Sequence, residues 1–166
     1  AKAQFNLGNM HRVGKEIPQN SELAAYWFIK SAEQEHMVAQ YNMGVAYAHG
    51  EGVPKNISAA LNWYNKAAEQ GHAKAEYQLG LMHKRGDGVS QSDEAAVIWF
   101  TKSAAQDNAS AQFNLGLMFD EGMGVIENSK TAAHWYTLAT QQGYAEAQLR
   151  LALMYEVGRG VPKNAP

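Results

Sequence analysis

The residues of this sequence that could do chemistry are few and follow no catalytic pattern. Asp87, Asp120 and Glu121 could act as general acid and base if two of them met at one site, but nothing in their spacing requires it. The sequence has no His-Glu-x-x-His pair, no Gly-x-Ser-x-Gly elbow and no kinase signature. The glycine-rich segments 50–52 and 86–88 lack the Lys-Ser or Lys-Thr ending of a phosphate-binding loop, so we interpret them as helix stops. The sequence therefore predicts a protein that is not an enzyme and uses no cofactor.

Histidine and cysteine usage predicts no metal site. His11 and His83 occupy a repeated position that otherwise holds aromatic residues, so we interpret them as packing residues. His36 and His72 share a second repeated position, where we expect capping or loop residues. Cysteine is absent, which excludes disulfides, thiolate metal sites and a cysteine nucleophile.

Composition limits the class of partner. The chain has 166 residues, 46% of them hydrophobic and 18% charged, as in a soluble folded protein. A formal net charge of −2 gives no overall attraction to nucleic acid or to an anionic membrane. No run of about 18 apolar residues could span a bilayer. We expect neither a nucleic-acid partner nor membrane insertion.

A period of 36 residues organises the sequence into repeats. The copies span 3–38, 39–74, 75–110, 111–146 and, in part, 147–166. Glycines that we expect to be structural recur at Gly14, Gly50, Gly86, Gly122 and Gly158. Tryptophans that we expect to be structural recur at Trp27, Trp63, Trp99 and Trp135. Because each copy of such an array buries its apolar face mainly against its neighbours, we expect a single repeat domain, residues 1–166.

Each full copy carries two helical patterns. Ala39, Met43, Ala46 and Tyr47 lie on one apolar helix face, and Gly50 can end that helix in the left-handed conformation. First helices are predicted near 3–13, 38–49, 74–85, 110–121 and 146–157. Second helices are predicted near 21–34, 57–70, 93–106 and 129–142, after N-caps at Asn20, Asn56, Ser92 and Asn128. The predicted fold class is all-α.

Glycines inside the first helices predict close helix packing. Gly8, Gly44, Gly80 and Gly116 lie mid-helix, where glycine costs about 1 kcal/mol relative to alanine. We therefore expect a neighbouring helix to pack on the bare backbone. The tryptophan column should supply the bulk, and removing a buried aromatic residue of that size costs about 3–5 kcal/mol.

These residues resemble the Sel-one-like repeat family, a branch of the tetratricopeptide-like α/α solenoids. The matching pattern is Ala-x-x-x-Leu-Gly-x-x-Tyr-x-x-Gly-x-Gly-Val-Pro, then Ala-x-x-Trp-Tyr-x-x-Ala-Ala and a glycine, and Ala39–Gly71 fits it at nearly every position. In the first copy Glu16 and Glu35 replace glycines and His11 replaces the aromatic residue, so that copy is expected to be less regular or to form a modified end. The resemblance implies a right-handed α/α superhelical solenoid and a role as an interaction scaffold.

In the tetratricopeptide-like folds the first helices line the concave side, which implies a binding surface here. We call the third, seventh, tenth and eleventh positions of each copy the first-helix stripe. Its candidate partner-binding residues are Phe5, Tyr41, Val45, His49, Tyr77, Leu81, Lys84, Arg85, Phe113, Leu117, Asp120, Glu121, Leu153 and Glu156. Arg12 and the two basic members lie in the first three copies and the acidic members in the last two, which would orient a partner of opposite polarity. The alternative is that the aromatic residues pack between repeats and the charges are solvated.

The expected partner is a protein or peptide, bound by an adaptor of bacterial type. One alternative is immunity to a secreted toxin, and another is the β-lactam-binding envelope enzymes of the cysteine-rich branch, whose paired cysteines are absent here. Apolar faces at 3–13 and 147–157 would be exposed unless further sequence or a second copy covers them, which makes self-association an expectation. The sequence starts without Met in mid-pattern, so we expect a fragment or a processed chain. Its compartment, periplasm, envelope or cytoplasm, is left open.

Overall fold

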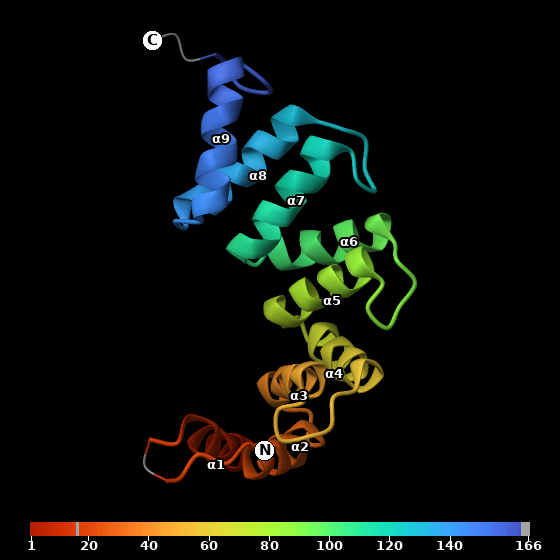
Figure 1. Ribbon diagram of the computed structural model, residues 1–166, viewed down its shortest axis with the longest axis vertical. Helices are drawn as coiled ribbons and strands as arrows, with labels where there is room; N and C mark the ends of the chain where they lie inside the picture. Colours follow the sequence, from red (N-terminus) through yellow and green to blue (C-terminus); the bar gives the residue numbers. More distant parts are fainter. Residues whose placement is uncertain (16, 164–166) are drawn as a thin grey trace. The chain divides into compact units, whose positions relative to one another are not determined.

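The computed structural model of the protein describes residues 1–15 and 17–163, and within them it contains α-helices and no strand (Figure 1). The helices are α1 (Lys2–Val13), α2 (Ser21–Ala32), α3 (Met37–His49), α4 (Ile57–Glu69), α5 (Ala73–Arg85), α6 (Asp93–Ala104), α7 (Ala109–Glu121), α8 (Ser129–Gln141) and α9 (Ala145–Val157). The prediction of an all-α repeat solenoid is confirmed. The expected irregularity at Glu16 lies outside the described residues.

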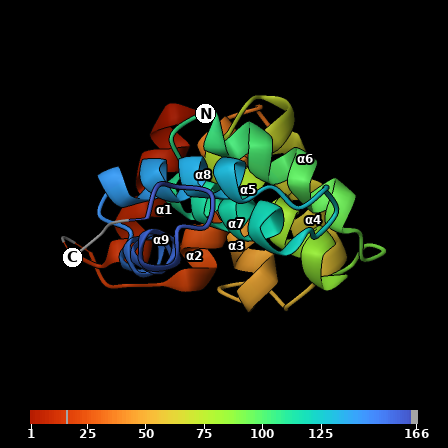
Figure 2. The ribbon, with the colours of Figure 1, turned by 90° about the horizontal axis from the view of Figure 1, so that it is seen from above.

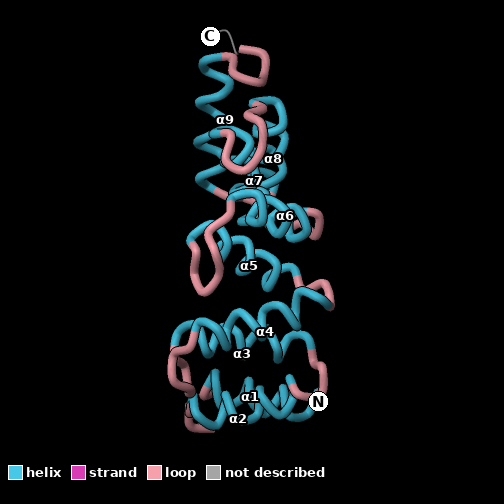
Figure 3. Tube along the Cα trace, turned by 90° about the vertical axis from the view of Figure 1, so that its right-hand side faces the viewer, coloured by secondary structure: helices cyan, strands magenta, loops and turns pink. Residues whose placement is uncertain are grey.

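The helices form two compact units. Unit 1 spans residues 1–75 and unit 2 spans 76–166, with the boundary inside α5. In unit 1, α1 packs on α2, α2 on α3 and α3 on α4, and Figure 3 shows α1 with α2 as one layer and α3 with α4 as the next. In unit 2 the sequence α6, α7, α8 and α9 packs in the same consecutive way. α8 and α9 lie side by side from the front and from above (Figures 1 and 2).

Local signals explain where the helices begin. The side chains of Asn20, Asn56 and Asn128 each accept a hydrogen bond from a backbone N–H three residues on, as an N-cap does, and Ser92 does the same. The expected capping role at His36 is also present, because its Nδ1 accepts from the Ala39 N–H at 3.2 Å. Each cap satisfies a backbone donor that the first helical turn leaves unpaired.

Left-handed residues explain where the helices end. Gly14, Gly50 and Gly122 have φ angles of 70°, 79° and 68° directly after first helices. After second helices the same conformation falls on Glu35 and Asp107, at φ of 61° and 59°. A side chain in this region costs about 1 kcal/mol. The second helices end one or two residues earlier than predicted because a short turn precedes this residue.

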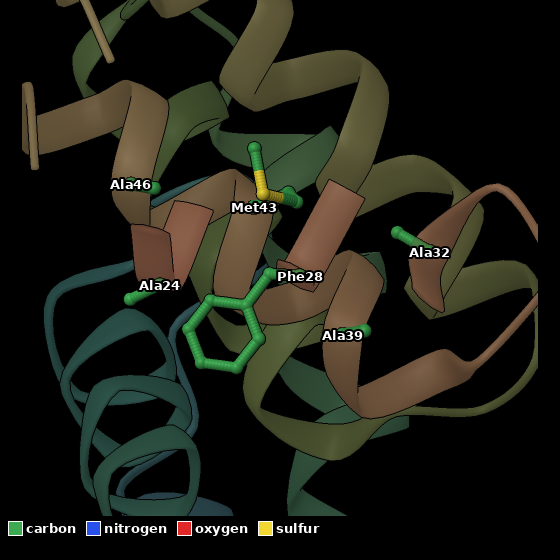
Figure 4. Close-up of a cluster of buried hydrophobic side chains, with 6 residues drawn as sticks. All are labelled: Ala24, Phe28, Ala32, Ala39, Met43 and Ala46. Atoms are coloured by element: carbon green, nitrogen blue, oxygen red, sulfur yellow. The ribbon is translucent and has the colours of Figure 1, made fainter. Parts of the chain in front are cut away.

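The core of unit 1 is built where α2 and α3 face each other. Phe28 of α2 and Met43 of α3 are its largest members, at 3% and 0% exposure. Figure 4 shows them surrounded by four alanines, Ala24, Ala32, Ala39 and Ala46. The alanines let the two helix backbones approach, and the two large side chains fill the space between them.

An aromatic ring lies against the mid-helix glycine of each full repeat. A Cβ added to Gly44 would lie 2.4 Å from Cδ1 of Tyr64, and one added to Gly116 would lie 2.6 Å from Cε1 of Tyr136. Gly8 and Gly80 meet the rings of Phe28 and Phe100 in the same way. The predicted packing of a neighbouring helix on bare backbone is therefore observed, and the neighbour is the repeat's own second helix.

The tryptophans do not supply the large, fully buried side chains of the core, which corrects our expectation. Trp27, Trp63, Trp99 and Trp135 are all only partly buried. The residue after each tryptophan is the buried one, as Phe100 and Tyr136 show at 0% exposure. The tryptophans lie at the edge of the core. There the Nζ atoms of Lys66 and Lys102 lie over the rings of Trp63 and Trp99, 4.5 and 4.4 Å from the ring centroids.

We predict that Gly44→Ala destabilises the protein although alanine is the better helix former. The new methyl group would collide with the Tyr64 ring, which is 3% exposed and packed on several sides, so overpacking should cost about 1–3 kcal/mol. The free energy of unfolding, measured by urea titration with circular dichroism, should fall accordingly. An increase of about 1 kcal/mol, the gain in helix propensity alone, would contradict the packing argument. Ala152→Gly, at the corresponding position of α9, where the side chain is exposed, controls for helix propensity.

A buried glutamine on each of two first helices, Gln40 and Gln112, bonds to a glutamine at the end of the following second helix. The Gln70 side chain donates to Gln40 Oε1 at 2.7 Å, and Gln142 donates to Gln112 at 2.8 Å. Gln40 and Gln112 in turn each donate to a helix-end carbonyl at 3.3 Å. Each buried amide therefore both accepts and donates, which satisfies groups that would otherwise be desolvated without a partner.

Glu76 occupies the corresponding position in the third repeat and is 4% exposed. Gln106 donates to its carboxyl at 2.7 Å, but an ionised carboxylate has no hydrogen to donate in turn. Burial raises the pKa of Glu76, although Lys102 and the Gln106 hydrogen bond oppose this. Because the folded-state pKa is raised, protonated Glu76 stabilises the fold at low pH, and that contribution is lost as the pH rises through the raised pKa.

We predict that Glu76→Gln stabilises the protein at neutral pH. The variant should gain about 1 kcal/mol at about pH 7, where the wild-type carboxyl is ionised, and little at about pH 4. Thermal unfolding at several pH values measures the effect. The exposed Glu156→Gln serves as the control and should change the stability by less than about 0.5 kcal/mol at either pH. Equal gains for the variant at both pH values would show that ionisation of Glu76 is not the cause.

Candidate binding groove

The aromatic residues of the first-helix stripe are half-buried within the repeats. Phe5 stacks on His36 at 4.6 Å between ring centroids, and Tyr41 stacks on His72 at 4.7 Å. Phe113 stacks on Tyr144 at 4.9 Å in unit 2, whereas Tyr77 packs on the Phe100 ring without such a stack. Each of these stripe rings therefore packs against another ring of the fold, as the packing alternative stated, and each remains partly exposed.

His72 holds Tyr41 in place while capping a helix. Its Nδ1 accepts from the Ala75 N–H at 3.2 Å, so the hydrogen of the neutral ring is on Nε2. Burial lowers the pKa of His72, and the neighbouring Lys74 lowers it further. His72 is therefore neutral near pH 7. Burial also raises the pKa of the Tyr41 hydroxyl, which is thus a neutral hydrogen-bonding group.

A hollow of about 270 Å³ lies between α1, α2 and α3 in unit 1. Its apolar lining consists of Phe28, Tyr41 and Val45, together with alanines of α2 and α3. Its polar lining consists of Arg12, Ser21, Asn42 and Glu51. Burial, followed by the nearby Tyr41 and Glu51, raises the pKa of the Tyr64 hydroxyl.

A second hollow of about 370 Å³ adjoins the first and shares Arg12, Tyr41 and Asn42 with it. Its other lining residues include Phe5, Asn9, Val38, His72 and Lys74. Two formal positive charges line this hollow and no carboxylate does. We call the two hollows together the unit 1 groove.

Two of the acidic stripe residues in unit 2 are paired within the chain. Asp120 is 7% exposed, and its carboxylate lies 2.9 Å from the Arg159 guanidinium. Arg159 also donates to the Asp120 carbonyl at 2.7 Å and to Ser129 Oγ at 3.1 Å. Asp120 was expected as an open acidic group for a partner, and this is corrected: it is a buried ion-pair member. Glu121 is exposed and lies 4.0 Å from Arg150.

The remaining stripe residues fall into two classes. Leu81, Leu117 and Val45 are half-buried, and the two leucines pack against the core clusters of unit 2. Lys84 is partly buried. The exposed members are His49, Arg85, Leu153 and Glu156. The end helices also expose the apolar residues Met10, Val13, Leu149 and Val157, and self-association through them stays a prediction.

The sequence predicts Arg12, Tyr41 and Val45, which line the groove, but it does not predict most of the polar residues that line it. Ser21 and Glu51 lie outside the first helices, at the start of α2 and in the loop after α3. Asn42 follows the stripe residue Tyr41 in α3, and Lys74 is the second residue of α5. The repeat pattern contained a signal for Glu51, since loop positions that vary between copies are candidates for contact with a partner.

In the part of the chain that the structure describes, no group of three or more His, Asp or Glu side chains is arranged to hold a metal ion. No helix among residues 1–15 and 17–163 has both the length and the apolar character that crossing a membrane requires.

The geometry defines an α/α repeat protein with a groove on its first helices, and comparison places it in a family. The Sel1 repeat family model matches residues 1–36, 38–72, 73–108, 109–144 and 145–166. The chain therefore belongs to the Sel1 repeat family, as the resemblance indicated. Proteins built from this repeat generally mediate protein–protein interactions and are generally not enzymes. No match was found among curated proteins.

Solved structures share the fold closely. A protective antigen present in uropathogenic Escherichia coli strains, with an SLR fold, is 34% identical, with a TM-score of 0.95 over 98% of this chain. A Sel1 repeat protein from Oxalobacter formigenes is 36% identical, with a TM-score of 0.91 over 98% of this chain. This chain spans 35% of the first protein and 65% of the second. Cysteine-rich protein B of Helicobacter pylori is 19% identical over 81% of this chain and 97% of its own, with a TM-score of 0.62, and shares the fold alone.

We predict that Arg159→Ala destabilises unit 2 far more than Arg150→Ala. Loss of Arg159 leaves the buried Asp120 carboxylate without its counter-charge, which should cost about 1–3 kcal/mol. Arg150 faces the exposed Glu121 at 4.0 Å, so its loss should cost less than about 0.5 kcal/mol. Urea unfolding at neutral pH measures both variants. If the two losses are equal, the Asp120 pair is no stronger than a surface ion pair.

Proposed function

We propose that this chain is a non-enzymatic scaffold that binds a protein or peptide partner through its first-helix stripe, with the unit 1 groove as the main contact. The observation that carries the proposal is the pair of adjoining hollows in unit 1, which combine an apolar floor with amide and charged rims. Apolar pockets with a few convergent polar groups are the usual form of a recognition site.

The stripe rings suit this role because they are already fixed. Tyr41 is held between the rings of Tyr64 and His72, at centroid distances of 5.9 and 4.7 Å. An aromatic residue that is immobile before binding loses little side-chain entropy when a partner packs against it. Rigid aromatic anchors are also the residue type most often found at the energetic centre of interfaces.

The general role of the family supports the same proposal, since Sel1 repeat proteins generally mediate protein–protein interactions. Within that role, we place the partner on the first helices and not on the second, whose exposed faces carry scattered apolar residues such as Ile98 and Leu23. Binding of a secreted toxin and binding of a β-lactam stay predictions from the resemblance.

The test uses peptides selected against the intact chain from a random display library. We predict that selected peptides bind the wild type and that Val45→Asp weakens binding by at least about tenfold, because it places a charge in the apolar floor of the smaller hollow. Fluorescence anisotropy gives the affinities, and circular dichroism verifies that the variant is folded.

Ile98→Asp is the matched control, since Ile98 is 57% exposed on α6, a second helix. It should leave the affinity unchanged. If Val45→Asp folds and binds as the wild type does, or if Ile98→Asp weakens binding equally, the groove is not the contact surface.

A further inference from the structure

Corresponding positions of the two units carry opposite charges. A shift of three repeats, 108 residues, places Asp120 on Arg12 and Arg159 on Glu51. The same shift places Ser129 on Ser21, so the serine is shared and only the two charges are exchanged. In unit 2 the pair is closed, with the acid and the guanidinium 2.9 Å apart.

In unit 1 the exchanged pair is open. Arg12 is exposed and donates only to the Asn9 side chain, at 3.3 Å from both Nε and Nη2. Among the residues that the structure describes, neither Arg12 nor Glu51 has an ion-pair partner within 4.0 Å. The smaller hollow lies between them, and both line it.

The floor of this hollow is also more apolar than its counterpart. Phe28 takes the place that Tyr136 has in unit 2, where the tyrosine hydroxyl lies 3.5 Å from Asp120. The Phe28 ring offers no hydroxyl, and Val45 and Ala46 complete the apolar lining. A space of about 270 Å³ with this lining suits one aliphatic or aromatic side chain.

The larger hollow calls for a different chemistry. Arg12 and Lys74 line it, and Asn9, Asn42 and the neutral His72 add hydrogen-bonding groups. In the described chain the Asn42 side chain has no hydrogen-bond partner, whereas Asn114, at the same repeat position two copies later, donates to the Ser110 carbonyl at 2.9 Å. Two cations and free amide groups without a lining carboxylate favour an anionic group, and a carboxylate accepts from both kinds of donor.

We propose that the unit 1 groove binds an extended acidic–apolar segment of a partner protein, a conclusion that rests on the proposed scaffold function. An apolar side chain of the segment enters the smaller hollow, and the side chain of Asp or Glu enters the larger one beside Arg12 and Lys74. The hollows adjoin, so the two side chains belong to one face of the segment. In an extended chain such side chains are two residues apart, about 7 Å, which gives the pattern apolar-x-acid or its reverse.

The test measures binding of short labelled peptide pools to the intact chain by fluorescence anisotropy. Each pool fixes Leu or Phe and, two residues away in either direction, Glu, Gln or Lys, with other positions varied. The peptides are acetylated and amidated so that the only carboxylate in the fixed pattern is the side chain. We expect the Glu pool to bind at least about tenfold more tightly than the Gln pool, and the advantage to shrink as salt is raised.

Arg12→Glu should lower the affinity for the Glu pool by at least about tenfold and create a preference for the Lys pool. Lys30→Glu is the matched control, because Lys30 is an exposed lysine of unit 1 on α2 and lines neither hollow. It should bind the Glu pool as the wild type does. The exchange of preference in Arg12→Glu is itself evidence of a folded groove, so a variant that merely unfolds cannot produce it.

The remaining outcomes separate the two proposals. Equal binding of the Glu and Gln pools, or equal loss in Arg12→Glu and Lys30→Glu, overturns the acidic–apolar assignment but leaves peptide binding in place. If no pool binds and no peptide can be selected from a random library, the scaffold proposal fails as well.

Discussion

The contact between a bare glycine backbone and the face of a buried aromatic ring sets the distance between the two helices of each full repeat. Gly44 against Tyr64 in unit 1 and Gly116 against Tyr136 in unit 2 are the same contact. With the helices this close, the remaining interface positions hold alanine, and residues such as Ala60 and Ala132 are fully buried. The aromatic residues of the first-helix stripe pack against these same buried rings, whereas the other stripe positions differ between copies.

Most of the fold could be predicted because its signals are local. A polar side chain at Asn56 or a glycine at Gly50 acts on the backbone within a few residues, and the boundaries that follow were right to within a residue or two. The tryptophan column was assigned wrongly because periodicity shows that a position is apolar without showing how deeply it lies. Asp120 was assigned wrongly for a related reason. Its partner, Arg159, is 39 residues away and reaches it only because the loop after α9 returns to α7.

The groove depends on a few side chains placed on a backbone that both units share. Arg12 and Glu51 in unit 1 correspond to Asp120 and Arg159 in unit 2, with the charges exchanged. In unit 2 the guanidinium of the loop meets the acid on the helix at 2.9 Å, whereas among the described residues Arg12 and Glu51 of unit 1 have no ion-pair partner within 4.0 Å. The same place in the repeat thus carries a closed ion pair in unit 2 and an open hollow in unit 1.

The loop after each first helix adds a constraint of another kind. Gly52 lies so close to the Ser21 carbonyl that an added Cβ would come within 1.9 Å of its oxygen, and Gly124 and Gly160 meet the start of earlier second helices in the same way. An inserted residue would move this glycine out of its close contact with the helix start. The loop therefore disfavours a change in repeat length. New binding specificities in such an array must therefore arise by exchanging side chains within a fixed frame, unlike antibody loops, which also vary their length.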